Sequence, residues 1–354
     1  MDSPHEAPPW REPVRGGYPD AFTARLSGVE QLRALIESGS APPIGRLVGM
    51  ALTDVGLGSA SFSMPATRWL LSPHGVISCG TLAILADGPL GCAVHSALPP
   101  ATMYSTSELS LRLLRPARAG GTLVARAGVV HAGRSLALSA VQITDGRGRL
   151  LADGSSLCFV RSISAGRDLP SPPAAPRGEA PHVDGPDPYE RPALGQVLRQ
   201  QIWDGMSGLQ ILQGQIAGDL PRPPIHYLTG LRPIEAGPRE AAFALPCHEW
   251  LCSPLRTVEG GVIAMLADSA LVSAIQTTAP PGAAVAAIDL KVNFLRPVPP
   301  DGRELVAHGR VRHAGRTISV AEADVVNAEG QPVALATGSA MVLPGRAAAL
   351  DAAD

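Results

Sequence analysis

The sequence lacks an excess of positive charge, an export signal and a long uninterrupted apolar run. It carries 29 Lys and Arg against 31 Asp and Glu. That balance leaves no surplus to neutralise a phosphate backbone, so we expect no nucleic-acid partner. The first residues contain no apolar segment of the signal-peptide type, and Asp87 and Asp268 interrupt the longest apolar stretches well short of a bilayer span. We therefore expect a cytoplasmic chain with no membrane partner.

The cysteines lack a pattern as well. There is no CxxC pair and no histidine at a metal-ligand spacing, and an odd set of this kind builds neither a disulfide framework nor a zinc site. We expect reduced core thiols, no metal and no cofactor. The five cysteines are Cys79, Cys92, Cys158, Cys247 and Cys252.

What the sequence does contain is a repeat. When the chain is compared with itself, one register dominates, with equivalent residues 181 positions apart. The matched strings include PPIGRLVG and PPIHYLTG, RWLLSP and EWLCSP, LAILAD and IAMLAD, LLRPA and FLRPV, and, one position further apart, HAGRS and HAGRT. At 354 residues the chain is also longer than one hydrophobic core usually grows. The sequence therefore predicts two copies of one domain.

A proline-rich run separates the two copies. Residues 164–192 hold too few apolar side chains to build a core and are typical of an extended linker. We place the first copy at residues 28–163 and the second at 193–345. Residues 1–27 are expected to be an extension, and residues 346–354 a tail.

Each copy has the same order of expected elements. A short amphipathic helix comes first, at 29–37 and 209–217, and a long apolar helix follows at about 76–96 and 258–277. Strands with period-2 alternation come next, and glycines mark hairpins between them. The sequence thus predicts an α+β fold in which the long helix packs on a curled antiparallel sheet.

The long helix is too apolar to leave half exposed, so we expect the two copies to fold against each other as an intramolecular pseudo-dimer. Two such chains can associate further, as a homo-oligomer of pseudo-dimers.

An aspartate recurs inside the long helix, as Asp87 in the first copy and Asp268 in the second. The residues around it, GGVIAMLAD in the second copy, are apolar almost all the way round, which indicates burial. A buried carboxyl either finds partners or faces a cleft where its perturbed pKa is useful. It is therefore either a structural cap or a general base or nucleophile.

Glycines stand where the same helix begins, Gly80 in the first copy and Gly260 and Gly261 in the second. Unpaired backbone N–H groups at a helix start, with the positive end of the dipole, can receive an oxyanion. A glycine there can equally serve close packing alone. Its recurrence together with the aspartate favours acyl transfer.

The string GGVIAMLAD, followed by DLKVNFLRP and then HAGR, resembles the PaaI-like hotdog thioesterases, and the resemblance covers nearly the whole chain, once per copy. It implies two hotdog domains paired so that the Asp of one faces the helix start of the other, with an acyl-CoA in the seam. It assigns the catalytic carboxyls to Asp87 and Asp268 and the carbonyl-polarising N–H groups to Gly80 and Gly261.

The chain departs from the family's usual residues near the helix start. The usual His is Ser78 or Glu259, and the usual upstream Asn is Ser72 or Ser253. An arginine before a proline in each copy is a candidate for the phosphates of coenzyme A, or is simply solvated. The expected substrate-binding set is Ser72, Ser78, Arg115, Ser253, Glu259, Gly260 and Arg296.

The first copy is chemically the weaker of the two. Cys79 replaces the first glycine, and Pro89 follows Asp87 inside the helix, where proline removes a backbone hydrogen bond and kinks the axis. We interpret Cys79 as a packing residue. We expect Asp268 to carry more of the activity than Asp87.

These features predict an acyl-CoA thioesterase that hydrolyses the thioester to free acid and CoA. Two alternatives stay open. One is a non-catalytic acyl-CoA-binding protein, which the Ser78 and Glu259 departures favour. The other is an enoyl-thioester hydratase, whose chemistry wants a carboxylate paired with a histidine, and no such pair recurs here.

Overall fold

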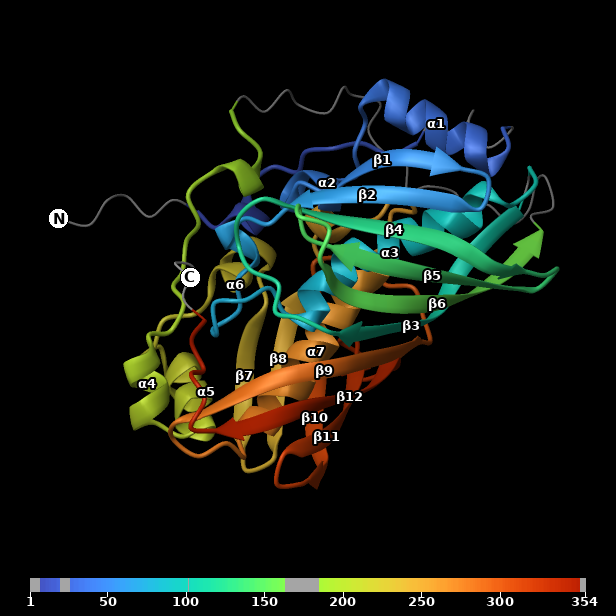
Figure 1. Cartoon of the computed structure of the whole chain (residues 1–354). Coiled ribbons are helices and arrows are strands. Elements are labelled where there is room, and N and C mark those ends of the chain that lie inside the picture. The colour runs from blue at the N-terminus through green and yellow to red at the C-terminus, as the bar shows by residue number, and fades with distance from the viewer. Residues whose placement is uncertain (1–6, 20–25, 101, 163–184, 351–354) are drawn as a thin grey trace.

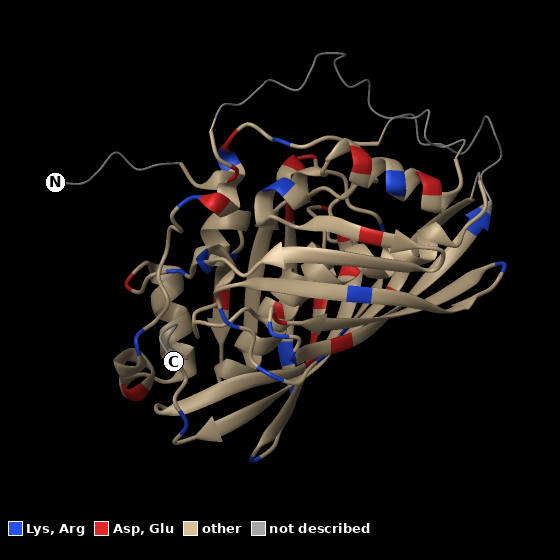
Figure 2. Ribbon diagram, turned by 45° about the horizontal axis from the view of Figure 1, so that its top comes forward, with Lys and Arg blue, Asp and Glu red and all other residues tan. Residues whose placement is uncertain are grey.

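A computed structural model describes residues 7–19, 26–100, 102–162 and 185–350. Each copy forms a hotdog domain, a curled antiparallel sheet around one long central helix (Figure 1). The α+β prediction is therefore confirmed. Figure 2 shows acidic and basic residues interspersed over the described part of the ribbon. Across the described ranges, no helix is long and apolar enough to cross a membrane.

The first copy contains the two helices that its sequence predicts and a third, short one between them. The long helix begins at Cys79, later than expected, because Ser78 is its N-cap and accepts a hydrogen bond from the Thr81 N–H (3.1 Å). Its elements are α1 (Gly28–Ser38), α2 (Pro43–Val48), β1 (Ala51–Gly56), β2 (Ser59–Pro65), η3 (Arg68–Leu70), α3 (Cys79–Ser96), β3 (Thr102–Leu113), β4 (Thr122–Ala132), β5 (Leu136–Thr144) and β6 (Leu150–Ser162).

The second copy repeats this order after one additional short helix, α4. Its long helix begins at Gly260 and has Glu259 as its N-cap residue, but the Glu259 side chain makes no capping hydrogen bond. Its elements are α4 (Gln200–Gly205), α5 (Gly208–Ala217), α6 (Pro224–Thr229), β7 (Arg232–Gly237), β8 (Glu240–Pro246), η5 (Glu249–Leu251), α7 (Gly260–Gln276), β9 (Ala283–Phe294), β10 (Glu304–Ala314), β11 (Ile318–Val326) and β12 (Pro332–Pro344).

The two sheets join edge to edge. Within the described residues, twelve strands form one antiparallel sheet in the order β1-β2-β4-β5-β6-β3-β9-β12-β11-β10-β8-β7. The junction is the β3–β9 pair, where Leu109 lies opposite Val292 and Leu111 opposite Leu290, all four buried. Figure 1 shows β3 and β9 side by side at the middle of the molecule. The copies thus share one sheet and one core, which is the pseudo-dimer that the sequence predicts.

The central helices α3 and α7 also touch directly, through equivalent glycines. A Cβ on Gly80 would lie 2.6 Å from the Cα of Met265, and one on Gly261 would lie 2.5 Å from the Cα of Ile84. Real Cβ atoms do not approach backbone so closely, so only glycine fits at either place. Close packing is therefore one reason for both glycines.

Two arms pack against the copies: an N-terminal arm, residues 7–19 with η1 (Pro9–Arg11), which contacts α6, and a second arm, residues 185–198 with η4 (Pro188–Glu190), which contacts α2. The buried Trp250 indole donates to the carbonyl of Glu12 (3.0 Å), and the buried Trp69 indole donates to that of Arg191 (2.9 Å). The Glu12 and Arg191 side chains then pair with each other through two hydrogen bonds of 2.8 Å. Each arm therefore holds one copy, and an ion pair connects the arms.

The arms are themselves equivalent, although the sequence places them in the extension and the linker. The strings PWREP and PYERP stand 179 positions apart, and Gly16 and Gly195 both adopt a positive φ at the matching bend. A comparison restricted to the dominant register of 181 misses this pair. The domain boundaries at 28 and 193 stay predictions.

Candidate active site

The candidate site in each copy is built by the central helix of one copy and the start of the central helix of the other. We call the first the Asp268 seam, formed by Asp268 with Ser78, Cys79 and Gly80. There the Asp268 side chain, 3% exposed, accepts a hydrogen bond from the Gly80 N–H with its Oδ2 atom (2.8 Å). The bond joins residues 188 positions apart, so it exists only in the assembled pair.

The Asp87 seam is the matching place in the other direction, formed by Asp87 with Glu259, Gly260 and Gly261. Oδ2 of Asp87 accepts a hydrogen bond from the Gly261 N–H (3.1 Å), and the Gly260 N–H also stabilises the carboxylate. Asp87 is partly exposed, whereas Asp268 is buried. The two seams therefore share their hydrogen-bond geometry and differ in access.

Both carboxyls are perturbed in the same direction. Burial raises the pKa of Asp87 and of Asp268 from 3.8 to about 6, and the glycine N–H groups oppose that rise. At Asp268 the Ser78 hydroxyl adds to this opposition. A carboxyl that titrates near 6 is ionised at neutral pH and is still a stronger base than an ordinary aspartate, which suits a general base.

The hydrogen bonds also restrict the chemistry. The N–H groups of Gly80 and Gly261, expected to polarise a substrate carbonyl, already have the opposing carboxylate as their acceptor. A carbonyl oxygen would have to take the place of a carboxylate oxygen there. Such an exchange would free the carboxylate to act on a water molecule or on the carbonyl carbon.

Comparisons with known proteins bear on what this geometry is for. The sequence model of the thioesterase superfamily matches residues 74–152 and again residues 256–334, each spanning one central helix and the strands after it. A protein of Halobacterium salinarum named "Putative esterase VNG_1336C" is 37% identical over 118 residues, which are 31% of this chain and 76% of that protein. The chain belongs to the thioesterase superfamily.

Solved structures of similar shape extend this result to the tandem fold. The tesB protein of Mycobacterium avium subspecies paratuberculosis shares 13% identity over 85% of this chain and 98% of its own, with a TM-score of 0.51. A hot dog fold protein of unknown function from Alicyclobacillus acidocaldarius shares 15% identity over 82% of this chain and 95% of its own, with a TM-score of 0.50. At these identities the likeness concerns the fold. The resemblance drawn from the sequence is confirmed for the thioesterase superfamily and for two tandem hotdog domains.

Around the Asp268 seam of this thioesterase-superfamily chain, Cys79 has no reactive character. It is fully buried, and burial raises the pKa of its thiol well above the ordinary range, with Asp268 adding to the rise. The thiolate is thus disfavoured, and packing explains the residue. All five cysteines are unpaired.

Pro89 does not end the central helix of the first copy. Helix α3 continues through it to Ser96, and Asp87 keeps the same type of contact that Asp268 makes. The contacts thus provide no reason to rank Asp268 above Asp87. The expected order of the two aspartates stays a prediction.

The serines in place of the family's usual Asn lie in equivalent turns ahead of each central helix. The Ser72 N–H donates to the Val76 carbonyl (2.8 Å), and the Ser253 N–H donates to the Thr257 carbonyl (2.9 Å). The Ser253 hydroxyl accepts from the Leu255 N–H, whereas the buried Ser72 hydroxyl has no hydrogen-bond partner among the described residues. Their backbone role is structural, and their contact with substrate stays a prediction.

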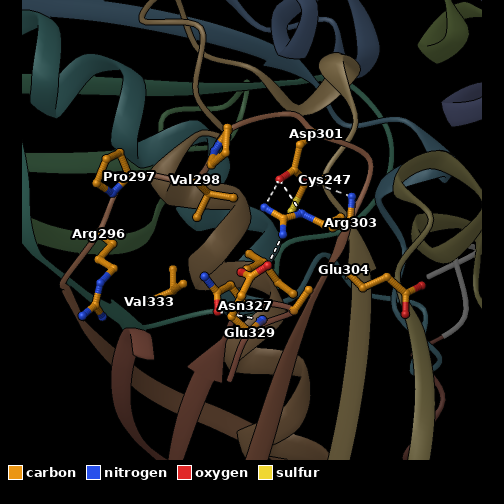
Figure 3. Close-up of a pocket in the computed structure, with 13 residues that line it drawn as sticks. Cys247, Arg296, Pro297, Val298, Asp301, Arg303, Glu304, Asn327, Glu329 and Val333 are labelled. Atoms are coloured by element: carbon orange, nitrogen blue, oxygen red, sulfur yellow. Dashed lines mark hydrogen bonds and ion pairs between the residues drawn. The ribbon is translucent and has the colours of Figure 1, made fainter. Parts of the chain in front are cut away.

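The two arginines have equivalent structural partners. The Arg115 guanidinium donates to the Leu150 carbonyl (2.6 Å), and the Arg296 guanidinium donates to the Pro332 carbonyl. Arg296 borders a cavity of about 50 Å³, in which Arg303 is held between Asp301 and Glu329 (Figure 3). That volume is far below what a coenzyme needs. A role for either arginine with phosphates therefore rests on exposure alone.

The sequence reasoning missed one difference near the Asp87 seam. A Cβ on Gly91, one turn after Asp87, would collide with the hydroxyl of Tyr104. At the equivalent positions the second copy has Val272 and Val285. This paired exchange is visible when the copies are aligned, and it makes the two seams unequal.

Proposed function

We propose that this chain hydrolyses acyl-CoA thioesters to free acid and CoA at the seams between its two hotdog domains. One observation carries the proposal. In each seam a perturbed aspartate from one central helix meets the backbone N–H groups at the start of the other central helix. Membership of the thioesterase superfamily makes the thioester the substrate class to test first.

In the proposed reaction the thioester carbonyl oxygen binds the glycine N–H groups in place of the carboxylate oxygen. The freed aspartate takes a proton from water as the water oxygen attacks the carbonyl carbon. Negative charge on the carbonyl oxygen is then stabilised by the N–H groups and the helix dipole. The C–S bond then breaks, the sulfur leaves with the bonding electron pair and takes up a proton in exchange for the one that the aspartate gives back, and the free acid is released. No cofactor takes part, and the unpaired cysteines support a reaction in the cytoplasm.

The test is a panel of short, medium and aryl acyl-CoA esters, monitored for release of free thiol. We expect turnover of at least one ester and its loss in the Asp87→Asn, Asp268→Asn double variant, because an amide keeps the shape but neither accepts a proton nor attacks. The double variant should keep the wild-type circular dichroism.

Other outcomes point to the alternatives. Ester binding without thiol release would favour a non-catalytic acyl-CoA-binding protein, and hydration of an enoyl-CoA with the thioester intact would favour a hydratase. Equal hydrolysis by wild type and the folded double variant would refute the aspartate mechanism.

A further inference from the structure

Glu259 is a buried carboxyl with an unused oxygen. It is 5% exposed, and its Oε2 atom is buried without a hydrogen-bond partner among the residues that the structure describes. As the N-cap residue of α7 it directly precedes Gly260. Gly260 lies against Asp87, because a Cβ added to this glycine would be 2.9 Å from Oδ2 of Asp87. The backbone is held in place, because the Glu259 N–H donates to the Leu251 carbonyl (3.0 Å). The Asp87 seam therefore contains two carboxyls.

The titratable groups around this pair are neutral at neutral pH. Cys92 on α3 and Cys252 after η5 both have a thiol pKa raised to about 12, chiefly by burial. Burial likewise raises the pKa of Tyr104, on β3, well above its usual range. No lysine, arginine or histidine of the described chain contributes to the pKa of Glu259 or Asp87. Among the described residues, no positively charged side chain compensates two carboxylates there.

Two effects compete for the charge on Glu259. The positive end of the α7 dipole favours the anion. Burial of an unpaired carboxylate disfavours the anion more strongly than one helix end favours it, so burial outweighs the dipole. Burial first, and then the charge of Asp87, raise the pKa of Glu259 well above its usual range. Glu259 is therefore the carboxyl of the pair that favours its protonated form.

We infer that Glu259 is a second catalytic residue of the Asp87 seam, a buried carboxylic acid that protonates the departing thiolate. This inference rests on the proposed thioester hydrolysis. The acid is specific to one seam, because the equivalent residue in the other seam is Ser78. Its hydroxyl accepts a hydrogen bond from the Thr81 N–H, as an ordinary helix cap does. The two seams thus differ in chemistry as well as in access.

The proton balance closes within the pair. Asp87 takes one proton from water as the new C–O bond forms, and the carbonyl π electrons move to oxygen. When the C–S bond breaks, the sulfur keeps its electron pair and receives the proton of Glu259. The proton on Asp87 then passes to the Glu259 carboxylate and restores the starting state. Thioester and water become acid and thiol, and nothing else is consumed.

The kinetic test uses leaving groups of different basicity in an Asp268→Asn background, where only the Asp87 seam can act. The acyl group is kept constant, and the leaving group is either coenzyme A or an aryl thiol, whose thiolate needs no proton. Glu259→Gln should lower kcat for the CoA ester about 100-fold, at the low end of general acid catalysis, and should lower it far less for the aryl thioester. With Glu259 present, kcat should fall at high pH as the acid loses its proton, and Glu259→Gln should abolish this fall. Glu259→Ser, which copies Ser78, serves if the glutamine variant does not fold.

Equal losses of kcat on both esters would show a structural role for Glu259 and overturn the inference. Inactivity of the folded Asp268→Asn protein, when wild type is active, would also overturn it. An independent readout is the infrared carbonyl stretch of a protonated carboxyl at pH 7. We expect the band in wild type and in Asp268→Asn, and its absence in Glu259→Gln. A wild type without the band overturns the shared proton, whatever the activity. If wild type shows the band but cleaves no thioester, the proposed function fails, and the acid role fails with it, while the stored proton stands.

Discussion

Replacing Asp268 by asparagine should stabilise the protein at alkaline pH. The folded carboxyl titrates near 6, while its ordinary value is 3.8, so between those pH values the folded state binds more protons than the unfolded state. Stability is therefore lost as the pH rises through this window. The shift corresponds to about 3 kcal/mol once the pH exceeds 6, at 1.36 kcal/mol per pKa unit. The Gly80 N–H and Ser78 contributions are already contained in that pKa.

The assay is urea unfolding of wild type and Asp268→Asn at pH 5 and pH 8. The variant should gain about 3 kcal/mol at pH 8 and about half of that at pH 5, where the wild-type carboxyl is mostly protonated in the folded state. Asp54→Asn, at an exposed site of β1, is the control and should show little difference at either pH. If the gain at pH 8 does not exceed the gain at pH 5, the carboxylate is not desolvated as the structure indicates, and the reasoning is wrong.

Three further predictions concern how the halves are held together. Gly80→Ala should lower the free energy of unfolding in urea by about 1–3 kcal/mol or more, since its Cβ would meet the backbone of α7. Gly205→Ala, with open space around it, should lower it far less, and equal losses in the two variants would contradict the close helix contact. Glu12→Ala and Arg191→Ala should each destabilise the protein, with a coupling energy of about 0.5–3 kcal/mol in a double-mutant cycle, and a coupling near zero would show that the arms act independently. Residues 193–345 alone should be insoluble or should homodimerise through the β9 edge, so a stable compact monomer of this piece would contradict the shared core.

The stability prediction and the activity predictions are connected by one cause. A carboxyl that is costly to bury is retained in both copies, and a neutral residue of the same shape would make the fold more stable. That is the expected behaviour of a functional site, where stability is given up for chemistry. Stabilisation of Asp268→Asn without any effect on thioester hydrolysis would separate the two.

The sequence by itself determined the two copies, the central helices and the residues those helices carry. These features depend on local patterns, such as the apolar run of GGVIAMLAD and the alternation of the strands, and local patterns survive without knowledge of what packs against them. The central helices begin two or three residues later in the structure than the sequence predicts, because Ser78 and Glu259 are N-cap residues and not part of the helix interior.

The tertiary structure alone decided the state of the candidate site. Three features depend on contacts between distant parts of the chain. The Gly80 N–H donates to Asp268, the Glu259 Oε2 atom is buried without a hydrogen-bond partner among the described residues, and Arg115 and Arg296 donate to carbonyls of a neighbouring strand. Burial and hydrogen-bond partners are properties of the packed pair, and they set each pKa. Periodicity along the chain carries no information about them, because two copies with the same recurring Asp and Gly became two seams that differ in access and in their ionisable groups.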